Sequence, residues 1–175
     1  MMALLALALL APPPQTVALA AAGPVRVGAP VPWFAGWDAS DQIINRSKLL
    51  KGAAPGTRAH VIVVFATWCA PCAEGLKRLA LAHDRLEAAG IRVLLVAWRQ
   101  DAETVQPWLA AQGIDPKTPV ILDRFGRAAV AMGAEQADKA TLPRTLVLAP
   151  DGTVRALFGI EGVDYIDRLV ALAQP

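Results

Sequence analysis

The sequence has very few residues of the kinds that bind metals. Of its 175 residues, only two are cysteines and two are histidines. A structural zinc ion normally takes four such ligands. There is no second cysteine pair, and His60 and His83 fall in different predicted elements. Cys69 and Cys72 therefore lack the partners for a zinc site, and no metal ligands are predicted.

The sequence also lacks a run of basic residues. Its 17 Lys and Arg and 15 Asp and Glu are mixed along the chain, and the formal net charge is +2. Nucleic-acid binding normally requires clustered positive charge, so no nucleic-acid partner is expected. A hydrophobic content of 55% with 18% charged residues is typical of a well-cored globular protein. The length suits one domain.

Charge is absent before Arg26. Residues 1–11 are all apolar, prolines occupy 12–14, and alanine and leucine fill 18–22. This apolar core of about 10 residues is too short to span a bilayer, and small-x-small triplets near residue 20 resemble a signal peptidase site. We interpret residues 1–22 as a signal peptide for export to the periplasm, followed by one domain at 23–175. The absence of Lys or Arg leaves two alternatives open, a disordered leader and a start codon placed too early.

The cysteines stand in the most informative stretch, Trp68-Cys69-Ala70-Pro71-Cys72. It follows an apolar run at 60–66 and precedes helix-forming residues at 73–89. A helix N-terminus favours a thiolate at the first cysteine, and proline suits the first helical turn. One sulfur can attack a substrate disulfide and the other can resolve the mixed disulfide. A purely structural disulfide is disfavoured because so small a loop removes little unfolded-state entropy.

The hydrophobic pattern predicts alternating strands and helices in an α/β fold. A β-branched run such as 60–66 indicates a strand buried on both faces, and the order indicates a central sheet with helices on both faces. Predicted strands lie at 33–37, 43–44, 60–66, 91–98, 120–122, 145–149 and 153–158. Predicted helices lie at 73–89, 101–112, 127–132 and 163–172.

Several segments resemble the TlpA/ResA-like family of thioredoxin-fold disulfide reductases. Residues Phe65 to Cys72 resemble the family's active-site motif, and residues 142–148 with Asp151-Gly152 resemble its cis-proline loop and hairpin. Residues 27–52 resemble the family's N-terminal β-hairpin. Residues 119–123 with Gly126 resemble its short strand-helix insert before the cis-proline loop. The resemblance predicts a thioredoxin-like fold with a central mixed sheet.

The resemblance also implies roles for individual residues. Cys69 would attack, Cys72 would resolve, and Pro143 would follow a cis bond from Leu142 in a loop that faces the cysteines and pairs with substrate. Trp68, next to Cys69, would stand on the rim and help to dock partners. The other rim residues of this interpretation are Ala70, Pro71, Leu142, Arg144 and Glu74.

A cellular role follows from the same resemblance. It implies an exported, monomeric reductant of protein disulfides that uses no cofactor beyond its own Cys69–Cys72 disulfide. A membrane thiol carrier of the DsbD/CcdA type would supply electrons, and cytochrome c maturation is one possible pathway. The direction of electron flow stays open, because potentials of this fold span about −270 to −120 mV.

Four positions depart from the family pattern. Val63 stands where thioredoxin has a buried aspartate, and Gly75 stands where ResA-like proteins often have a glutamate. Glu74 is one residue early, which turns its carboxylate by about 100° on a helix, so it is either a proton relay or an ordinary first-turn acid. Arg144 replaces a small polar residue, and either contacts the Cys69 thiolate or an acidic substrate, or is simply solvated.

The main alternative function is a non-catalytic copper carrier that binds Cu(I) through both thiolates, since Cu(I) prefers soft ligands. Such carriers usually add a distant histidine, and none follows His83. A peroxidase is disfavoured because it uses a single peroxidatic cysteine in a different motif. A DsbA-like oxidase is disfavoured because residues 98–142 leave no room for its helical insertion.

Overall fold

The computed structural model describes residues 25–137, 139–160 and 162–174. The predicted leader at 1–22 lies outside the described residues. Among the residues described, no helix is long and apolar enough to cross a membrane.

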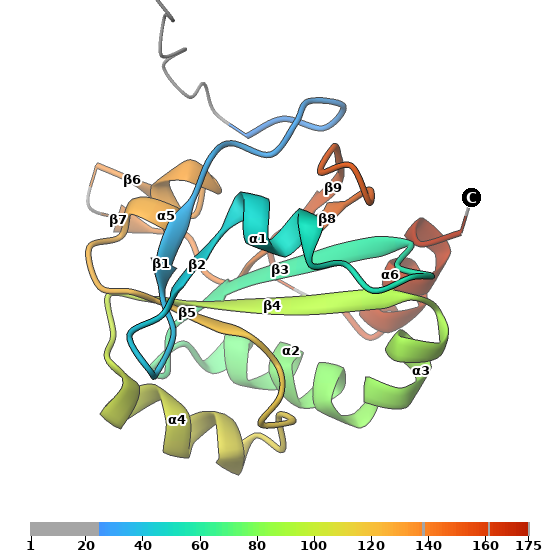
Figure 1. Ribbon diagram of the computed structural model, residues 1–175. Coiled ribbons are helices and arrows are strands. Elements are labelled where there is room, and N and C mark those ends of the chain that lie inside the picture. Colours follow the sequence, from blue (N-terminus) through green and yellow to red (C-terminus); the bar gives the residue numbers. More distant parts are fainter. Residues whose placement is uncertain (1–24, 138, 161, 175) are drawn as a thin grey trace, which may run out of the picture.

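A seven-stranded mixed sheet forms the centre of the domain (Figure 1). Its strand order is β2-β1-β5-β4-β3-β8-β9. The three central strands β5, β4 and β3 are parallel, and the remaining pairs are antiparallel. The strands are β1 Ala35–Trp37, β2 Ile43–Asn45, β3 Ala59–Phe65, β4 Ile91–Trp98, β5 Val120–Asp123, β8 Arg144–Leu148 and β9 Val154–Phe158.

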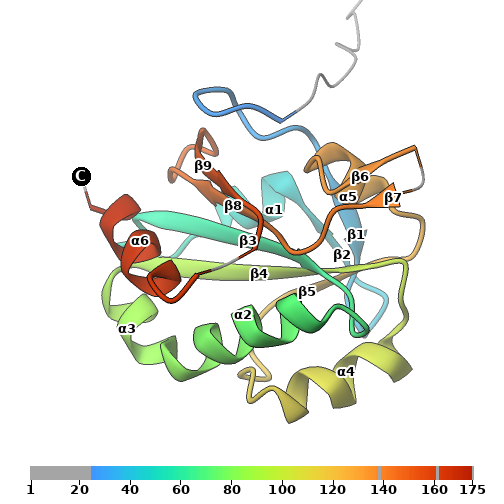
Figure 2. The same cartoon turned by 180° about the vertical axis from the view of Figure 1, so that it is seen from behind.

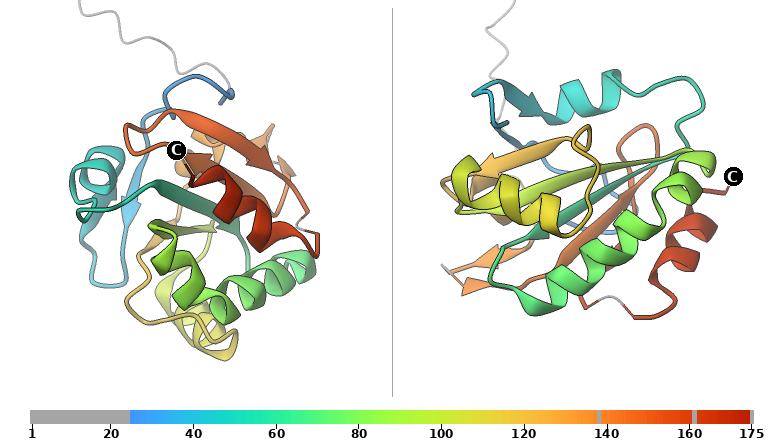
Figure 3. Two further views of the ribbon diagram at one scale, coloured as in Figure 1. Left: turned by 90° about the vertical axis from the view of Figure 1, so that its right-hand side faces the viewer. Right: turned by 90° about the horizontal axis from the view of Figure 1, so that it is seen from below.

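Helices cover both faces of this sheet, as Figures 2 and 3 show from other sides. One face carries α2 Ala70–Leu81, α3 His83–Ala88, α4 Ala102–Ala111 and α6 Tyr165–Leu172. The other carries α1 Arg46–Lys51, α5 Arg127–Ala131 and the segment before β1. These observations confirm the predicted thioredoxin-like fold, with its N-terminal hairpin of β1 and β2 and its strand-helix insert of β5 and α5.

Strand β3 shows why the fold could be predicted. All seven of its residues are buried, because helices pack on both faces of the central sheet. Val63 and Phe65 belong to the core beneath α2, whereas Ile62 and Val64 belong to the core beneath α5. This alternation follows from the two-residue period of a strand. The same alternation assigns each residue of a strand near the site to one of the two faces of the sheet.

A single helix was predicted at 73–89, and these bounds are wrong. It begins earlier, at Ala70, and it is divided at Ala82 into α2 and α3. Alanine has a high helix propensity, so the break at Ala82 is caused by tertiary packing rather than by the residue itself. Helix α2 packs against α6, whereas α3 packs against β4, so the chain changes direction between them.

Three smaller differences concern short elements. The last helix begins at Tyr165 rather than 163. Helix α1 and a small hairpin of β6 Glu135–Gln136 and β7 Lys139–Ala140 were not predicted. Each has six residues or fewer, which is too short for a hydrophobic period to be recognised.

Gly36 lies where the N-terminal hairpin packs against the sheet. A Cβ atom built there would stand 2.3 Å from Cγ2 of Ile121, a fully buried side chain. Replacing Gly36 with alanine should therefore lower the free energy of unfolding by about 1–3 kcal/mol, as overpacking does. Gly159→Ala is the matched control, because nothing lies within 4 Å of its Cβ position. Equal urea midpoints for the two variants would contradict the packing argument.

Candidate active site

Cys69 and Cys72 form a disulfide where β3 leads into α2. Their Cα atoms are 5.2 Å apart. Cys69 is the N-cap of α2, and its Sγ accepts a hydrogen bond from the Cys72 amide at 3.3 Å. The first sulfur therefore lies at the positive end of the helix, where backbone N–H groups and the helix dipole stabilise a thiolate.

The two sulfurs differ in how close they lie to the surface. Cys72 is 1% exposed and Cys69 is 6% exposed. Ala70 and Pro71 are exposed between them, and Pro71 occupies the first turn of α2, as expected. A partner would therefore meet Cys69 before Cys72, which supports the predicted order of attack and resolution.

The bond between Leu142 and Pro143 is cis, as predicted. Pro143 is buried and Leu142 is half-buried between both cores. Strand β8 runs antiparallel to β3, with Arg144 opposite Val64. By this register Pro143 lies beside Phe65, at the end of β3 that leads to Cys69. The structure therefore places the loop and the disulfide at the same end of the sheet.

Trp68 stands on the rim of the site and is 63% exposed. Its ring packs edge-on against Trp98, with ring centres 5.8 Å apart. The indole Nε1 of Trp98 donates to Glu135, a carboxylate that is only 7% exposed and that also accepts from Arg99 at 2.5 Å. The exposed indole is thus supported by a second tryptophan held by a buried carboxylate. Sequence reasoning did not identify Glu135.

Gln100 supports the segment before the cysteines. The Thr67 amide donates to Oε1 of Gln100 at 2.9 Å, and Nε2 of Gln100 donates to Oγ1 of Thr67 at 2.7 Å. One side chain just after β4 thus holds both the amide and the hydroxyl of Thr67, the residue before Trp68. No sequence motif marks this contact, because 33 residues separate the two partners.

Gln100→Ala should lower the free energy of unfolding by about 1–3 kcal/mol, because it leaves a partly buried amide without its partner. Gln100→Glu is the matched control. Its carboxylate can accept from both the amide and the hydroxyl of Thr67, so most of the stability should be retained. Urea unfolding of the three proteins checks this, and an unchanged midpoint for Gln100→Ala would contradict it.

The structure supplies no buried acid at the positions where the family has one. Val63 is 2% exposed within the core, and Gly75 is buried in α2. Glu74 lies on the outer surface of α2, where its carboxylate stands 3.8 Å from the Lys77 ammonium. These positions favour an ordinary surface acid at Glu74 over a proton relay.

The structure argues against two of the three interpretations of Arg144, contact with the Cys69 thiolate and full solvation, while contact with an acidic substrate stays a prediction. Arg144 pairs with Val64, so strand alternation places its side chain on the face opposite the cysteines. No hydrogen bond joins it to either cysteine among the described residues. It is not fully solvated either, because it is half-buried, its Nε is buried, and its guanidinium lies 3.6 Å from a Cβ position at Gly133. Burial lowers the pKa of Arg144.

The fold and the site together define a thioredoxin-fold protein with a Cys-x-x-Cys disulfide at a helix N-terminus. The sequence profile of the AhpC/TSA family matches residues 27–157. This is most of the chain, and the protein belongs to the AhpC/TSA family. No curated protein sequence matches it significantly.

Solved structures of thiol-disulfide proteins have the same fold. One is a thiol:disulfide interchange protein of the thioredoxin family from Chlorobium tepidum, 23% identical, with a TM-score of 0.64 over 85% of this chain and 98% of that one. Another is a secreted disulfide oxidoreductase of Mycobacterium tuberculosis homologous to E. coli DsbE, 15% identical, with a TM-score of 0.61 over 79% and 94%. At these identities the likeness shows the fold alone.

A peroxidase shares the fold to a similar degree. The 2-Cys peroxiredoxin of Plasmodium vivax is 17% identical, with a TM-score of 0.65 over 85% of this chain and 81% of that one. Fold similarity therefore does not separate the two activities. Two cysteines in one helical turn are an arrangement that suits disulfide exchange.

Proposed function

We propose that this protein is an exported thiol-disulfide oxidoreductase that reduces disulfides of extracytoplasmic proteins. The observation that carries the proposal is the position of Cys69, whose sulfur caps α2 and accepts the Cys72 amide. That position stabilises the thiolate needed for attack. The buried Cys72 stands within one turn to complete the exchange.

The surroundings of the disulfide support a protein as the substrate. Exposed Trp68 offers an apolar docking surface next to Cys69. The Leu142–Pro143 loop lies at the same end of the sheet and offers a backbone edge to an extended segment of substrate. We propose that the protein works as a monomer and receives electrons from a membrane thiol carrier of the DsbD/CcdA type. Cytochrome c maturation is the pathway that we propose.

The direction of electron flow is tested by equilibrating the domain with thiol–disulfide buffers and trapping the thiols with an alkylating reagent. A reductant should have a potential near that of thioredoxin, about −270 mV. It should also accelerate the reduction of insulin by dithiothreitol. A potential near about −120 mV, typical of a strong oxidant, would contradict the reductive role while leaving disulfide exchange intact.

Export is proposed from the charge-free, apolar composition of residues 1–22. Its test is N-terminal sequencing of the protein recovered from a periplasmic extract of a Gram-negative host. A mature terminus close to residue 23 would support a cleaved signal. Full-length protein confined to the cytoplasm would contradict export.

A further inference from the structure

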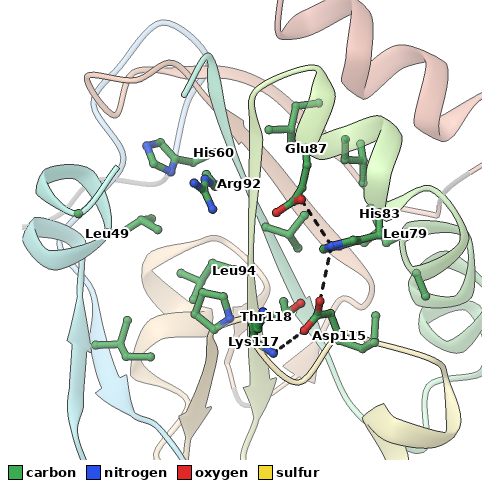
Figure 4. A pocket seen from close by; sticks show the side chains of 18 of the residues that line it. Leu49, His60, Leu79, His83, Glu87, Arg92, Leu94, Asp115, Lys117 and Thr118 are labelled. Atoms are coloured by element: carbon green, nitrogen blue, oxygen red, sulfur yellow. Dashed lines mark hydrogen bonds and ion pairs between the residues drawn. The ribbon is translucent and has the colours of Figure 1, made fainter. Parts of the chain in front are cut away.

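A groove lies at the end of the sheet opposite the disulfide, with a volume of about 680 Å³ (Figure 4). It opens where β4 extends beyond its neighbour, since β5 pairs with β4 only from Leu95 onward. His60 in its wall is the second residue of β3, and Cys69 follows the other end of that strand. About 17 Å of strand therefore separates the groove from the active-site end.

His60 is the most unusual group in the groove. Its side chain is 1% exposed, and neither ring nitrogen has a hydrogen-bond partner among the described residues. Buried polar groups without partners are rare and costly. Burial, and then the charge of Arg92, lowers the pKa of His60, so the ring is neutral near pH 7. A neutral imidazole still offers one N–H donor.

Cations stand next to this imidazole. Arg92 occupies the paired position on β4, so the two side chains lie side by side on one face of the sheet (Figure 4). Arg92 is exposed and forms no ion pair with any residue in the described ranges. Lys48 of α1 also lines the groove, and its ammonium donates to the Ile43 carbonyl at 3.4 Å.

The carboxylates that line the groove lie next to groups other than His60 and Arg92. Glu87 and Asp115 flank His83 at 3.8 and 3.6 Å, on the other side of the groove from His60. Asp38 accepts hydrogen bonds from two backbone amides of its own turn. The His60 end of the groove is therefore positively charged and able to donate hydrogen bonds.

Apolar side chains surround this positive end. Leu49 comes from α1, Ile44 from β2 and Leu94 from β4, and all three line the groove. We propose that the groove binds a small carboxylate with an apolar body. The carboxylate accepts hydrogen bonds from Arg92 and His60, and the body covers the three aliphatic side chains. One bound carboxylate would thus give a hydrogen-bond acceptor to both the His60 imidazole and the Arg92 guanidinium.

Hexanoate is a suitable probe, and hexanamide is its uncharged match. With only two histidines in the chain, the imidazole Hε1 protons give two NMR signals that His60→Gln assigns. At pH 7.5, hexanoate should shift the His60 signal in a saturable way, while hexanamide should bind at least about tenfold more weakly, because charge-assisted hydrogen bonds are the stronger. Equal binding of the two probes, or no saturable shift, would overturn the proposal.

Arg92→Gln should weaken hexanoate binding by about tenfold or more. Lys117→Gln is the matched control, because Lys117 also lines the groove but lies near Asp115 rather than His60. Both variants should reduce insulin normally, since the groove lies far from the disulfide. A shift confined to His83, or an equal loss in both variants, would place the anion elsewhere and overturn the assignment.

Discussion

Replacing Cys69 with serine should reduce insulin reduction to the uncatalysed rate. In the proposed reaction Cys69 provides the nucleophile, and a serine hydroxyl at ordinary pH does not attack a disulfide. The substitution is mild for the fold, because serine is a favoured N-cap residue. Its hydroxyl oxygen can accept the Cys72 amide as the sulfur does. Loss of activity with unchanged urea unfolding of the reduced proteins would identify a chemical role.

Alkylation of the reduced wild-type protein at graded pH provides an independent check. Cys69 should react first, with a pKa below that of a free cysteine, about 8.5. The physical cause is the N-terminus of α2, whose N–H groups and dipole favour the charged sulfur. Mass spectrometry of the labelled peptides distinguishes the two thiols. Preferential labelling of Cys72 would contradict the assignment.

The central part of this site could be predicted from sequence because its signals are local. The β-branched run that forms β3 requires burial on both faces, and the cysteines stand directly after it. Pro71 marks the first turn of the helix. The Leu142–Pro143 bond was predicted from the family resemblance, since no local rule makes that proline cis. Each of these features can be recognised from residues that are neighbours in the chain or from a short motif.

The residues that support the site could not be predicted in the same way. Gln100 binds Thr67 across 33 positions, and Glu135 binds Trp98 across 37. Such contacts depend on how strands and loops are brought together, and they leave no period in the sequence. Gln100 follows β4, and Glu135 begins β6.

The orientation of Arg144 is a different case, because it follows from the period of a strand. Side chains alternate along a strand, and the residue after Arg144 faces the core beneath α2, where the Thr145 hydroxyl lies 3.2 Å from that of Tyr165. Arg144 must then face the other way, toward the core beneath α5. Applying this period to the strand that follows Pro143 would have excluded contact with the Cys69 thiolate.

Replacing Cys72 with serine should trap substrate proteins on Cys69. Attack by the Cys69 thiolate breaks the substrate disulfide, forms a mixed disulfide and releases one substrate thiolate. In the wild type, Cys72 then attacks the Cys69 sulfur, closes the disulfide seen in the structure and releases the second substrate thiolate. Without Cys72 this second step cannot occur. Nearly all of the steady-state activity should be lost, while the first step survives.

Non-reducing gels of cells that carry Cys72→Ser should show discrete adducts that disappear with dithiothreitol. The double variant Cys69→Ser/Cys72→Ser is the matched control and should show none. Complete absence of adducts, with the protein exported and reduced, would count against disulfide exchange and favour the copper carrier. A Cu(I) titration of the reduced wild type would then decide, because a carrier should bind one ion through both thiolates and either serine variant should lose that binding.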